Sequence, residues 1–378
     1  MQVAQAILRS TANISSELSP LAALQPNLVL AFGSVELLKS AAPVLSVAFP
    51  GARRIGCSTA GEISSDGVAD GACVVTAVRF DKTSLVEVSA RLAGMDDSRA
   101  AGARLGTALP KDGLRAVLIF GQGVQINGSA LLAGMADVLG TDLPITGGLA
   151  GDGGAFKQTW VLDETGARSD TIVALGLYGK NLSFCHGSFG GWSPFGPARK
   201  VTRCVGNILY ELDGEPALEV YKRYLGEHAK DLPASGLLFP FGMLGKNHDE
   251  TGVIRTILGI DEQEGSLTLA GEIDPDGYLK LMHASTDALV NGAEAAAEAA
   301  KKMLTGADNG LVLLVSCVGR KLVMGGRVDE EVEAVADVFG QGAVLTGFYS
   351  YGEISPFSPS VECKLHNQTM TVTYLGED

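Results

Sequence analysis

A short glycine-rich motif that recurs along the chain constrains the fold more than any other feature of the sequence. Its first copy reads Gly56-Cys57-Ser58-Thr59-Ala60-Gly61-Glu62-Ile63-Ser64, and related copies occur at residues 269–273 and 349–355. A degenerate fourth copy, residues 147–154, has Asp152 at the carboxylate position. Repetition of this kind predicts a scaffold of related units.

The segments around the first copy follow a simple order. Residues 27–32 form a short apolar run that is typical of a strand, and residues 35–48 show the spacing of an amphipathic helix. Residues 54–58 and the valine-rich stretch 72–80 have the composition of further strands. These segments predict one β-α-β-β unit.

The same order of segments recurs at residues 116–178 and again at 311–375. We therefore predict a mixed α/β (α+β) fold in which repeated β-α-β-β units form mixed sheets covered by helices. The chain is expected to have two related halves, residues 1–197 and 198–378.

Composition excludes several classes of protein. A net charge of -14 repels nucleic-acid phosphates, and no stretch approaches the run of about 20 apolar residues that spans a bilayer. The N-terminal residues 1–15 lack the apolar core of a signal peptide, and the six cysteines are far apart, without a C-x-x-C pair. We expect reduced cysteines in a cytoplasmic protein that binds no nucleic acid and has no membrane span.

Five stretches of the chain together have a recognisable pattern: residues 56–62, 147–152, 206–214, 347–353 and 365–369. They resemble the FIST family, and the resemblance covers nearly the whole chain as a FIST N-terminal and a FIST C-terminal half. The resemblance implies an intracellular small-ligand sensor of signal transduction. It also implies a separate partner, such as a histidine kinase, a diguanylate cyclase or phosphodiesterase, or a chemotaxis protein.

We expect no output domain beside the two halves, and in this the chain resembles the nitric-oxide-sensing branch of the family. That branch implies haem b as cofactor, although the sequence has no C-x-x-C-H haem signature. Haem requires an axial donor in an apolar pocket.

Three histidines are candidates for the axial donor. The first is His186, which shares a strand face with apolar residues and runs into a predicted aromatic, glycine-rich loop, 187–197, where Trp192 would help to wall a pocket. His366 is expected on one face with residues 370, 372 and 374, and His283 on one face with residues 279 and 281. Each of the three would otherwise be a hydrogen-bonded core histidine.

Other candidates come from the motif copies and their neighbours. Cys57 and Cys317 are either reactive thiols, with Arg320 available to lower the pKa of Cys317, or small buried residues. The motif carboxylates either bind a ligand amine or accept backbone amides in the glycine turns, and repetition favours the second function. These carboxylates are Glu62, Glu272 and Glu353, and Tyr349 and Asn367 are further ligand-binding candidates.

No serine-hydrolase elbow, P-loop or zinc-protease motif occurs, so we expect no enzyme. The function hypothesis is a sensor, with haem and nitric oxide as cofactor and signal, whose site lies where the glycine-rich loops converge. The alternatives are a sensor of an amino acid or another small metabolite and a cysteine-dependent enzyme. The sequence leaves the oligomeric state open.

Overall fold

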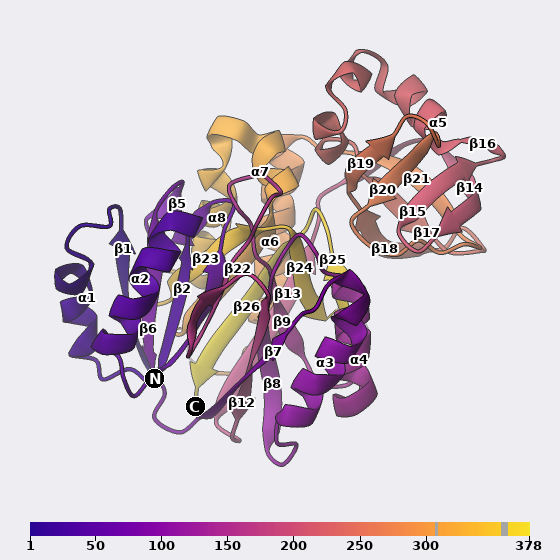
Figure 1. Cartoon of the computed structure of the whole chain (residues 1–378). Helices are drawn as coiled ribbons and strands as arrows, with labels where there is room; N and C mark the ends of the chain where they lie inside the picture. Colours follow the sequence, from indigo (N-terminus) through magenta and orange to yellow (C-terminus); the bar gives the residue numbers. More distant parts are fainter. Residues whose placement is uncertain (307–308, 357–361) are drawn as a thin grey trace.

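The structure, a computed structural model, describes residues 1–306, 309–356 and 362–378. Three of its β-sheets build a body that contains both chain ends, and a fourth forms a separate lobe at the upper right of Figure 1. This lobe consists of residues 193–283 and interrupts the body between a strand and a helix. Helices cover the outer faces of the body, which confirms the predicted mixed α/β fold.

The first unit of the body has the predicted order. Strands β2 (Leu28–Gly33) and β3 (Arg53–Ser58) run parallel, joined by helix α2 (Val35–Ala48). Strand β6 (Cys73–Arg79) pairs antiparallel with β2. Strand β1 (Gln2–Leu8), which the sequence did not indicate, pairs with β6 at the edge of the sheet. The chain between β1 and β2 forms helix α1 (Ile14–Ala22).

The same plan occurs twice more, so the body consists of three related units. The second unit has strands β7 (Ser84–Arg91), β8 (Leu114–Gly121), β9 (Ile145–Leu149) and β12 (Thr171–Tyr178), with helices α3 (Ser98–Ala108) and α4 (Gly128–Leu139). The third has strands β13 (Leu182–Phe189), β22 (Leu311–Cys317), β23 (Val344–Ser350) and β26 (Met370–Glu377), with helices α6 (Thr286–Met303), α7 (Val318–Met324) and α8 (Asp329–Phe339).

Each unit donates a hairpin to the sheet of another unit. Hairpin β4 (Glu62–Ser64) to β5 (Gly67–Ala69) joins the third sheet, β10 (Val161–Asp163) to β11 (Gly166–Arg168) joins the first, and β24 (Gly352–Pro356) to β25 (Cys363–His366) joins the second. The motif copies in the body are therefore the points at which the chain leaves one sheet and enters the next.

The first glycine of each body motif is required by close backbone packing. A Cβ atom on Gly56 would lie 1.8 Å from the Ala31 carbonyl oxygen, and the equivalent distance is 1.8 Å for Gly347 and 1.9 Å for Gly147. The φ angles of the three glycines are 158°, 156° and 140°. Glycine alone tolerates such an approach, so the repeated motif records a repeated structural constraint.

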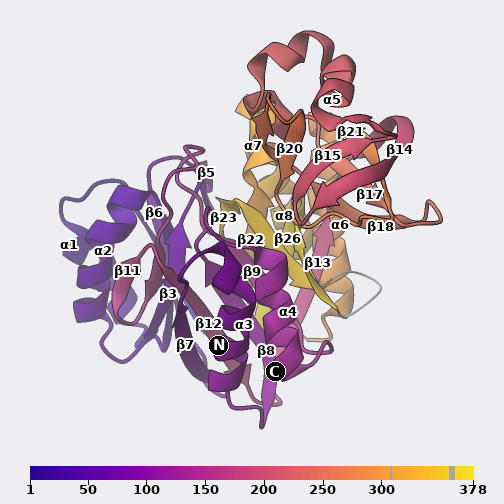
Figure 2. The ribbon, with the colours of Figure 1, turned by 45° about the vertical axis from the view of Figure 1, so that its right-hand side comes forward.

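The lobe folds as an antiparallel sheet with one α-helix and two short 3-10 helices, Gly226–Asp231 and Ala234–Leu237. Its elements are β14 (Ser193–Val205), β15 (Ile208–Leu212), β16 (Glu215–Pro216), α5 (Ala217–Leu225), β17 (Phe241–Leu244), β18 (Glu250–Arg255), β19 (Ile257–Asp261), β20 (Ser266–Leu269) and β21 (Tyr278–His283). Turned by 45°, the lobe still stands beyond the end of the body, above α6 (Figure 2). Among the helices of the described residues, none is long and apolar enough to cross a membrane.

The predicted loop over residues 187–197 is wrong. Strand β13 continues to Phe189, and β14 begins at Ser193, so only three residues separate the two strands. The glycines of this stretch serve close packing, because a Cβ atom on Gly191 would lie 2.1 Å from the Ala288 carbonyl oxygen on α6.

Candidate functional site

The three motif loops of the body meet and bond to one another through their backbones. A closed ring of hydrogen bonds results, with each loop donating to or accepting from both others. The bonds run from Gly151 N to Ser58 O (2.8 Å), from Ala60 N to Tyr349 O (2.8 Å) and from Tyr351 N to Leu149 O (3.0 Å). The loops converge as the sequence predicted, but they satisfy one another and leave few backbone groups for a ligand.

The motif carboxylates hold these loops in place. One oxygen of Glu62 accepts the Thr59 hydroxyl and the other accepts the backbone amide of Ala72 at 2.9 Å. Glu353 repeats the arrangement, accepting the Ser350 hydroxyl at 2.6 Å and the Thr369 amide at 3.2 Å. Burial raises the pKa of Glu62 to about 7 and that of Glu353 to about 8. Both glutamates accept backbone amides, but these amides belong to Ala72 and Thr369 and lie outside the motif copies themselves.

The two remaining motif copies differ from each other. Asp152 behaves like the glutamates, because its carboxylate accepts three consecutive backbone amides, beginning with Phe156 at 2.8 Å. Glu272 lies in the lobe, is exposed and contributes its backbone carbonyl, not its side chain, to a buried arginine. The copy at 269–273 is therefore a similarity of sequence without an equivalent place in the fold.

Tyr349 and Arg320 belong to a buried network centred on Glu331. Arg320 Nη2 lies 2.7 Å from Glu331 Oε2, and the Tyr349 hydroxyl donates to Glu331 Oε1 at 2.6 Å. Arg320 also donates to the backbone carbonyls of Leu289 and Gly190, which lie near the two connections to the lobe. Both side chains are fully buried, and their bonds hold α7, α8, α6 and the chain just before the lobe together.

The candidate cysteines lie inside the core. Cys57 and Cys317 are buried, and burial raises the pKa of each thiol. Arg320 lowers the pKa of Cys317 only slightly against this desolvation. A protonated, inaccessible thiol is a poor nucleophile, and both residues fit the description of small buried side chains.

The candidate histidines and Trp192 occupy separate places. His366 is buried on β25 with Nε2 3.0 Å from the Ser355 carbonyl, and burial lowers its pKa to about 4. The prediction that His366 shares a face with residue 370 is wrong, because β25 and β26 belong to different sheets. His186 is half-buried on β13, and burial lowers its pKa. His283 is exposed at the end of β21.

Trp192 and Asn367 lie close to the connection to the lobe. Trp192 is bonded to the backbone, and Asn367 is buried. The Trp192 indole Nε1 donates to the Gln368 carbonyl at 2.8 Å. Asn367 is buried, and its Oδ1 has no hydrogen-bond partner in the part of the chain that the structure describes. Neither residue lines the cavity described next.

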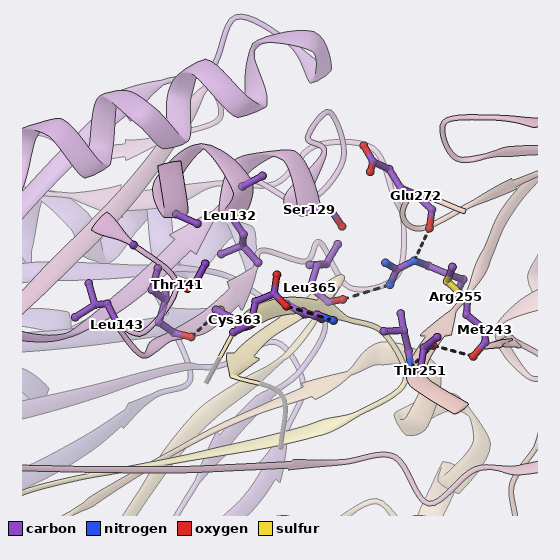
Figure 3. A pocket seen from close by; sticks show the side chains of 17 residues that line it. Ser129, Leu132, Thr141, Leu143, Met243, Thr251, Arg255, Glu272, Cys363 and Leu365 are labelled. Atoms are coloured by element: carbon purple, nitrogen blue, oxygen red, sulfur yellow. Dashed lines mark hydrogen bonds and ion pairs between the residues drawn. The ribbon is translucent and has the colours of Figure 1, made fainter. Parts of the chain in front are cut away.

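A cavity of about 340 Å³ lies between the body and the lobe. The body contributes one face of α4 and the outer strand β25, and the lobe contributes β17 and β18 (Figure 3). Its walls are mainly apolar. The lining includes Leu132, Ala133, Ala136, Cys363 and Leu365 from the body and Met243, Thr251, Val253, Arg255 and Glu272 from the lobe.

Arg255 is the most buried charged group of this cavity, whose lining also includes Glu272, Glu362 and Lys364. It is 7% exposed, and its guanidinium donates to the carbonyls of Glu272 (3.2 Å) and Leu365 (3.2 Å), as Figure 3 shows. A further bond of 3.3 Å joins Nη1 to the Ile254 carbonyl. Among the described residues no carboxylate lies within ion-pair distance of Arg255. Burial lowers its pKa to about 10, and Glu272 opposes this shift.

Sequence reasoning missed this site. The run 253–260 reads as an apolar strand, and the arginine inside it was the available signal, since a charged side chain is seldom placed within a buried strand. The run is in fact divided at Thr256 between β18 and β19, and the arginine ends β18.

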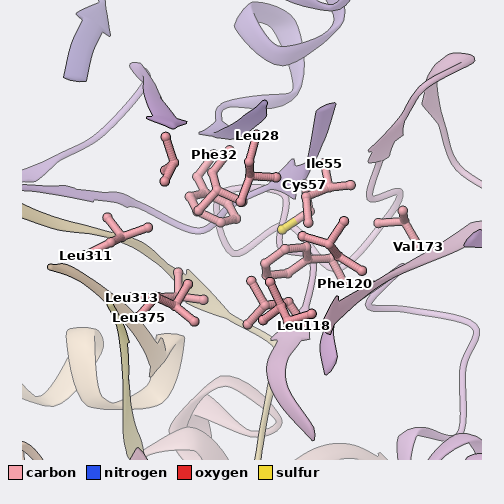
Figure 4. Close-up of a cluster of buried hydrophobic side chains, with 14 of the residues drawn as sticks. Leu28, Phe32, Ile55, Cys57, Leu118, Phe120, Val173, Leu311, Leu313 and Leu375 are labelled. Atoms are coloured by element: carbon pink, nitrogen blue, oxygen red, sulfur yellow. The ribbon is translucent and has the colours of Figure 1, made fainter. Parts of the chain in front are cut away.

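The residues of the body do not fit haem. The centre where the three units meet is filled by packed side chains, among them Phe32 and Phe120, whose ring centroids lie 5.2 Å apart (Figure 4). The cavity beside Arg255 is lined by none of His186, His283 and His366. Haem needs a donor inside an apolar pocket, and the described residues bring the two together at neither place.

Comparisons with known proteins place the chain in a family. A model of the FIST N domain matches residues 27–215, and a model of the FIST C domain matches residues 217–356. The uncharacterized protein MJ1623 of Methanocaldococcus jannaschii is 27% identical over 220 residues, which are 54% of this chain and 41% of that protein. The chain thus aligns with less than half of that relative.

Two solved structures share a distant likeness across the whole chain. Both are cyanuric acid hydrolases, one of them from A. caulinodans, with 10% identity and a TM-score of 0.37. The alignments cover 100% of this chain and 98% and 99% of those chains. A likeness this low supports no inference about activity. The two domain models together decide the family: the chain belongs to the FIST family, whose domains are sensors of signal transduction.

Proposed function

We propose that this chain is a sensor that binds its ligand in the cavity between body and lobe. The observation that carries the proposal is that this cavity is lined from both parts, with α4 and β25 on one side and β17 and β18 on the other. A ligand that contacts both sides stabilises one arrangement of the lobe relative to the body. Binding is thereby converted into a change that another molecule can recognise.

The motif loops are less suitable as a binding site. Their carboxylates and backbone groups are already bonded to each other, and a ligand would have to break those bonds. The metabolite version of the sensor hypothesis therefore moves from Glu62 and Glu353 to the cavity beside Arg255. An amino acid or another small metabolite is compatible with its volume.

Filling the cavity tests the proposal. Ala136 lies on the cavity face of α4, and Ala136→Phe places a ring in the space that a ligand would occupy. Thermal-shift measurements with a panel of amino acids and small organic acids should find a stabilising compound, and a ligand at 100 times its dissociation constant adds about 2.7 kcal/mol. The shift should disappear in Ala136→Phe.

Ser46→Phe is the matched control, because Ser46 lines a groove beside the corresponding helix of the first unit, far from the lobe in sequence. This variant should keep the ligand response. A response that survives Ala136→Phe unchanged places the ligand elsewhere and overturns the proposal.

The haem form of the hypothesis has no support from the described donors, and its test is an absorbance spectrum recorded after haem is added. We expect no Soret band. A band that is lost in only one of His186→Ala, His283→Ala and His366→Ala would restore haem sensing of nitric oxide and identify the axial ligand.

We infer that a separate protein reads the state of the lobe. The classes that the family implies are histidine kinases, diguanylate cyclases or phosphodiesterases, and chemotaxis proteins. Co-purification with candidate partners, with and without a compound that shifts the melting temperature, tests this step. Equal recovery in both conditions would count against transmission through the lobe.

A further inference from the structure

Arg255 is a buried cation that the chain itself does not neutralise. Its three hydrogen bonds, at 3.2, 3.2 and 3.3 Å, all go to backbone carbonyls and lie at the long end of the normal range. They use Nε and Nη1, whereas Nη2 has no hydrogen-bond partner among residues 1–306, 309–356 and 362–378. The two N–H groups of Nη2 remain available.

The Glu272 carboxylate, which also lines the cavity and acts on Arg255 electrostatically, forms no ion pair with it. The Glu272 side chain belongs to an exposed residue, and its Oε1 accepts a bond of 3.4 Å from Asn127 on the body. A buried charge without a partner is costly, and proteins retain such a charge mostly where something else completes it. The guanidinium at the wall of a cavity is therefore an incomplete anion site.

We propose that Arg255 binds the carboxylate of a small organic acid whose apolar part occupies the cavity. The planar guanidinium suits a carboxylate, which can accept more than one of its N–H groups. Ser129, in the first turn of α4, lines the same cavity, and the positive end of this helix dipole adds to the attraction for an anion.

The remaining lining defines the rest of the ligand. Leu132, Met243, Val253 and Leu365 present apolar side chains, and Thr251 already donates its hydroxyl to the Met243 carbonyl at 2.7 Å. Lys364, Glu362 and Glu272 also line the cavity but are less buried than Arg255. A cavity of about 340 Å³ with one buried cation and mainly apolar walls fits a short aliphatic or aromatic carboxylate better than a sugar or a phosphorylated compound.

This inference rests on the proposed function, because it assigns a ligand class to the same cavity. It also explains how binding joins the two parts. Arg255 belongs to the lobe, and through Nη1 it already donates to Leu365 of the body. A carboxylate on Nη2 would hold the side chain in this bridging position.

The first experiment needs no variant. Isothermal titration of the full chain with butyrate, 3-methylbutyrate and benzoate is compared with titration of the corresponding amides and of inorganic phosphate. We expect each binding acid to lose at least about tenfold in affinity when converted into its amide, since a charge-assisted bond is lost. Phosphate should bind more weakly than the best acid.

The second experiment uses Arg255→Met and Arg255→Lys. The methionine variant should lose acid binding, and the lysine variant, which keeps the charge without the planar fork, should bind at least about tenfold more weakly. The control is Arg54→Lys, because Arg54 is also buried and bonded to backbone carbonyls but lies in the first unit. It should bind like the unaltered chain, and circular dichroism establishes that each variant is folded.

The outcomes separate the two proposals. Equal affinity for acid and amide, or unchanged binding in folded Arg255→Met, overturns the carboxylate site. If only a neutral compound binds and Ala136→Phe abolishes its binding, the sensor cavity stands and the carboxylate inference is wrong. If an acid binds with Arg255 dependence but Ala136→Phe has no effect, the location of the cavity site is wrong instead.

Discussion

Two buried arginines of this chain solve the same electrostatic problem in opposite ways. Arg320 is fully buried and forms an ion pair with Glu331, which is equally buried and also accepts hydrogen bonds from Ser316 and Tyr349. Arg255 is almost as buried but donates only to backbone carbonyls at the wall of a cavity. The first charge is completed within the fold, whereas the second is left for another molecule.

The comparison distinguishes a buried charge that stabilises the fold from one that is available to a ligand. The Arg320 network lies where the chain enters and leaves the lobe, and each of the three guanidinium nitrogens of Arg320 has a hydrogen-bond partner. The Arg255 guanidinium lies where body and lobe face each other across open space. Burial alone therefore does not identify a site, but burial without a partner beside a cavity does.

The largest loss of stability is expected from breaking the buried ion pair between Arg320 and Glu331. Arg320→Met leaves the Glu331 carboxylate buried without its cation and should lower the free energy of unfolding by about 3–5 kcal/mol in urea denaturation. The double variant Arg320→Met with Glu331→Met removes both charges and should recover most of this loss. Equal destabilisation of the single and double variants would show that the ion pair is not the reason.

Arg255→Met should cost less stability, about 1–2 kcal/mol, because it leaves no opposite charge behind and removes only long bonds to carbonyls. The same urea denaturation measures it. A loss as large as that of Arg320→Met would mean that Arg255 is a structural strap between lobe and body, and the comparison between the two arginines would fail.

The buried carboxylates extend the comparison to the opposite charge. Glu353 and Glu62 have no ion-pair partner in the described residues, and their folded-state pKa values of about 8 and about 7 lie above the ordinary value of 4.5. The folded state therefore holds protons that the unfolded state releases. Their stabilising contribution is complete below about pH 4.5 and is lost as pH rises through 7 and 8.

Denaturation at pH 5, 7 and 9 measures this loss. In Glu353→Gln, whose amide resembles the protonated acid, stability should fall less steeply over this interval. A slope identical to that of the unaltered chain would show that Glu353 is ionised throughout, with its hydrogen bonds sufficient to hold the charge.

The smallest loss of stability is expected for an arginine that forms its ion pair at the surface. Arg99 on α3 forms a bidentate contact with Asp137 on α4, at distances of 2.8 and 3.1 Å, and both side chains are largely exposed. Solvent screens this pair, so Arg99→Ala should cost about 0.2–1 kcal/mol, and added salt should reduce the difference. A larger cost would mean that helix packing against α4 depends on Arg99 in a way that charge does not explain.

The repeated units were predictable because their signals are local. The helix over 35–48 and the strands around it follow from apolar spacing, and they reappear as α2 and its neighbours. The exchange of hairpins among the units was not predictable, since strand pairing depends on residues far apart in sequence, as in the pairing of Phe348 with Glu62.

The candidate site divides in the same way. Repetition indicated that Glu62 and Glu353 accept backbone amides, and both do so, although the amides lie outside the motif copies. Residues that occur once, such as His186, Cys317 and Arg255, gave no comparable pattern. Their functions depend on the side chains that pack around them, and these neighbours cannot be predicted from residue spacing in the sequence.

By itself, the sequence determined the family, the mixed α/β units and the recurrence of Gly56, Gly147 and Gly347, since these are patterns along the chain. The reason for the three glycines lies in the fold, because a carbonyl of the neighbouring strand excludes a Cβ atom at each of them. Only the tertiary structure decided which buried charge is paired. Arg320 meets a glutamate eleven residues away, and Arg255 meets a carbonyl more than a hundred residues away and a cavity. Desolvation and partner geometry arise when distant segments pack, and they set the electrostatics of the site.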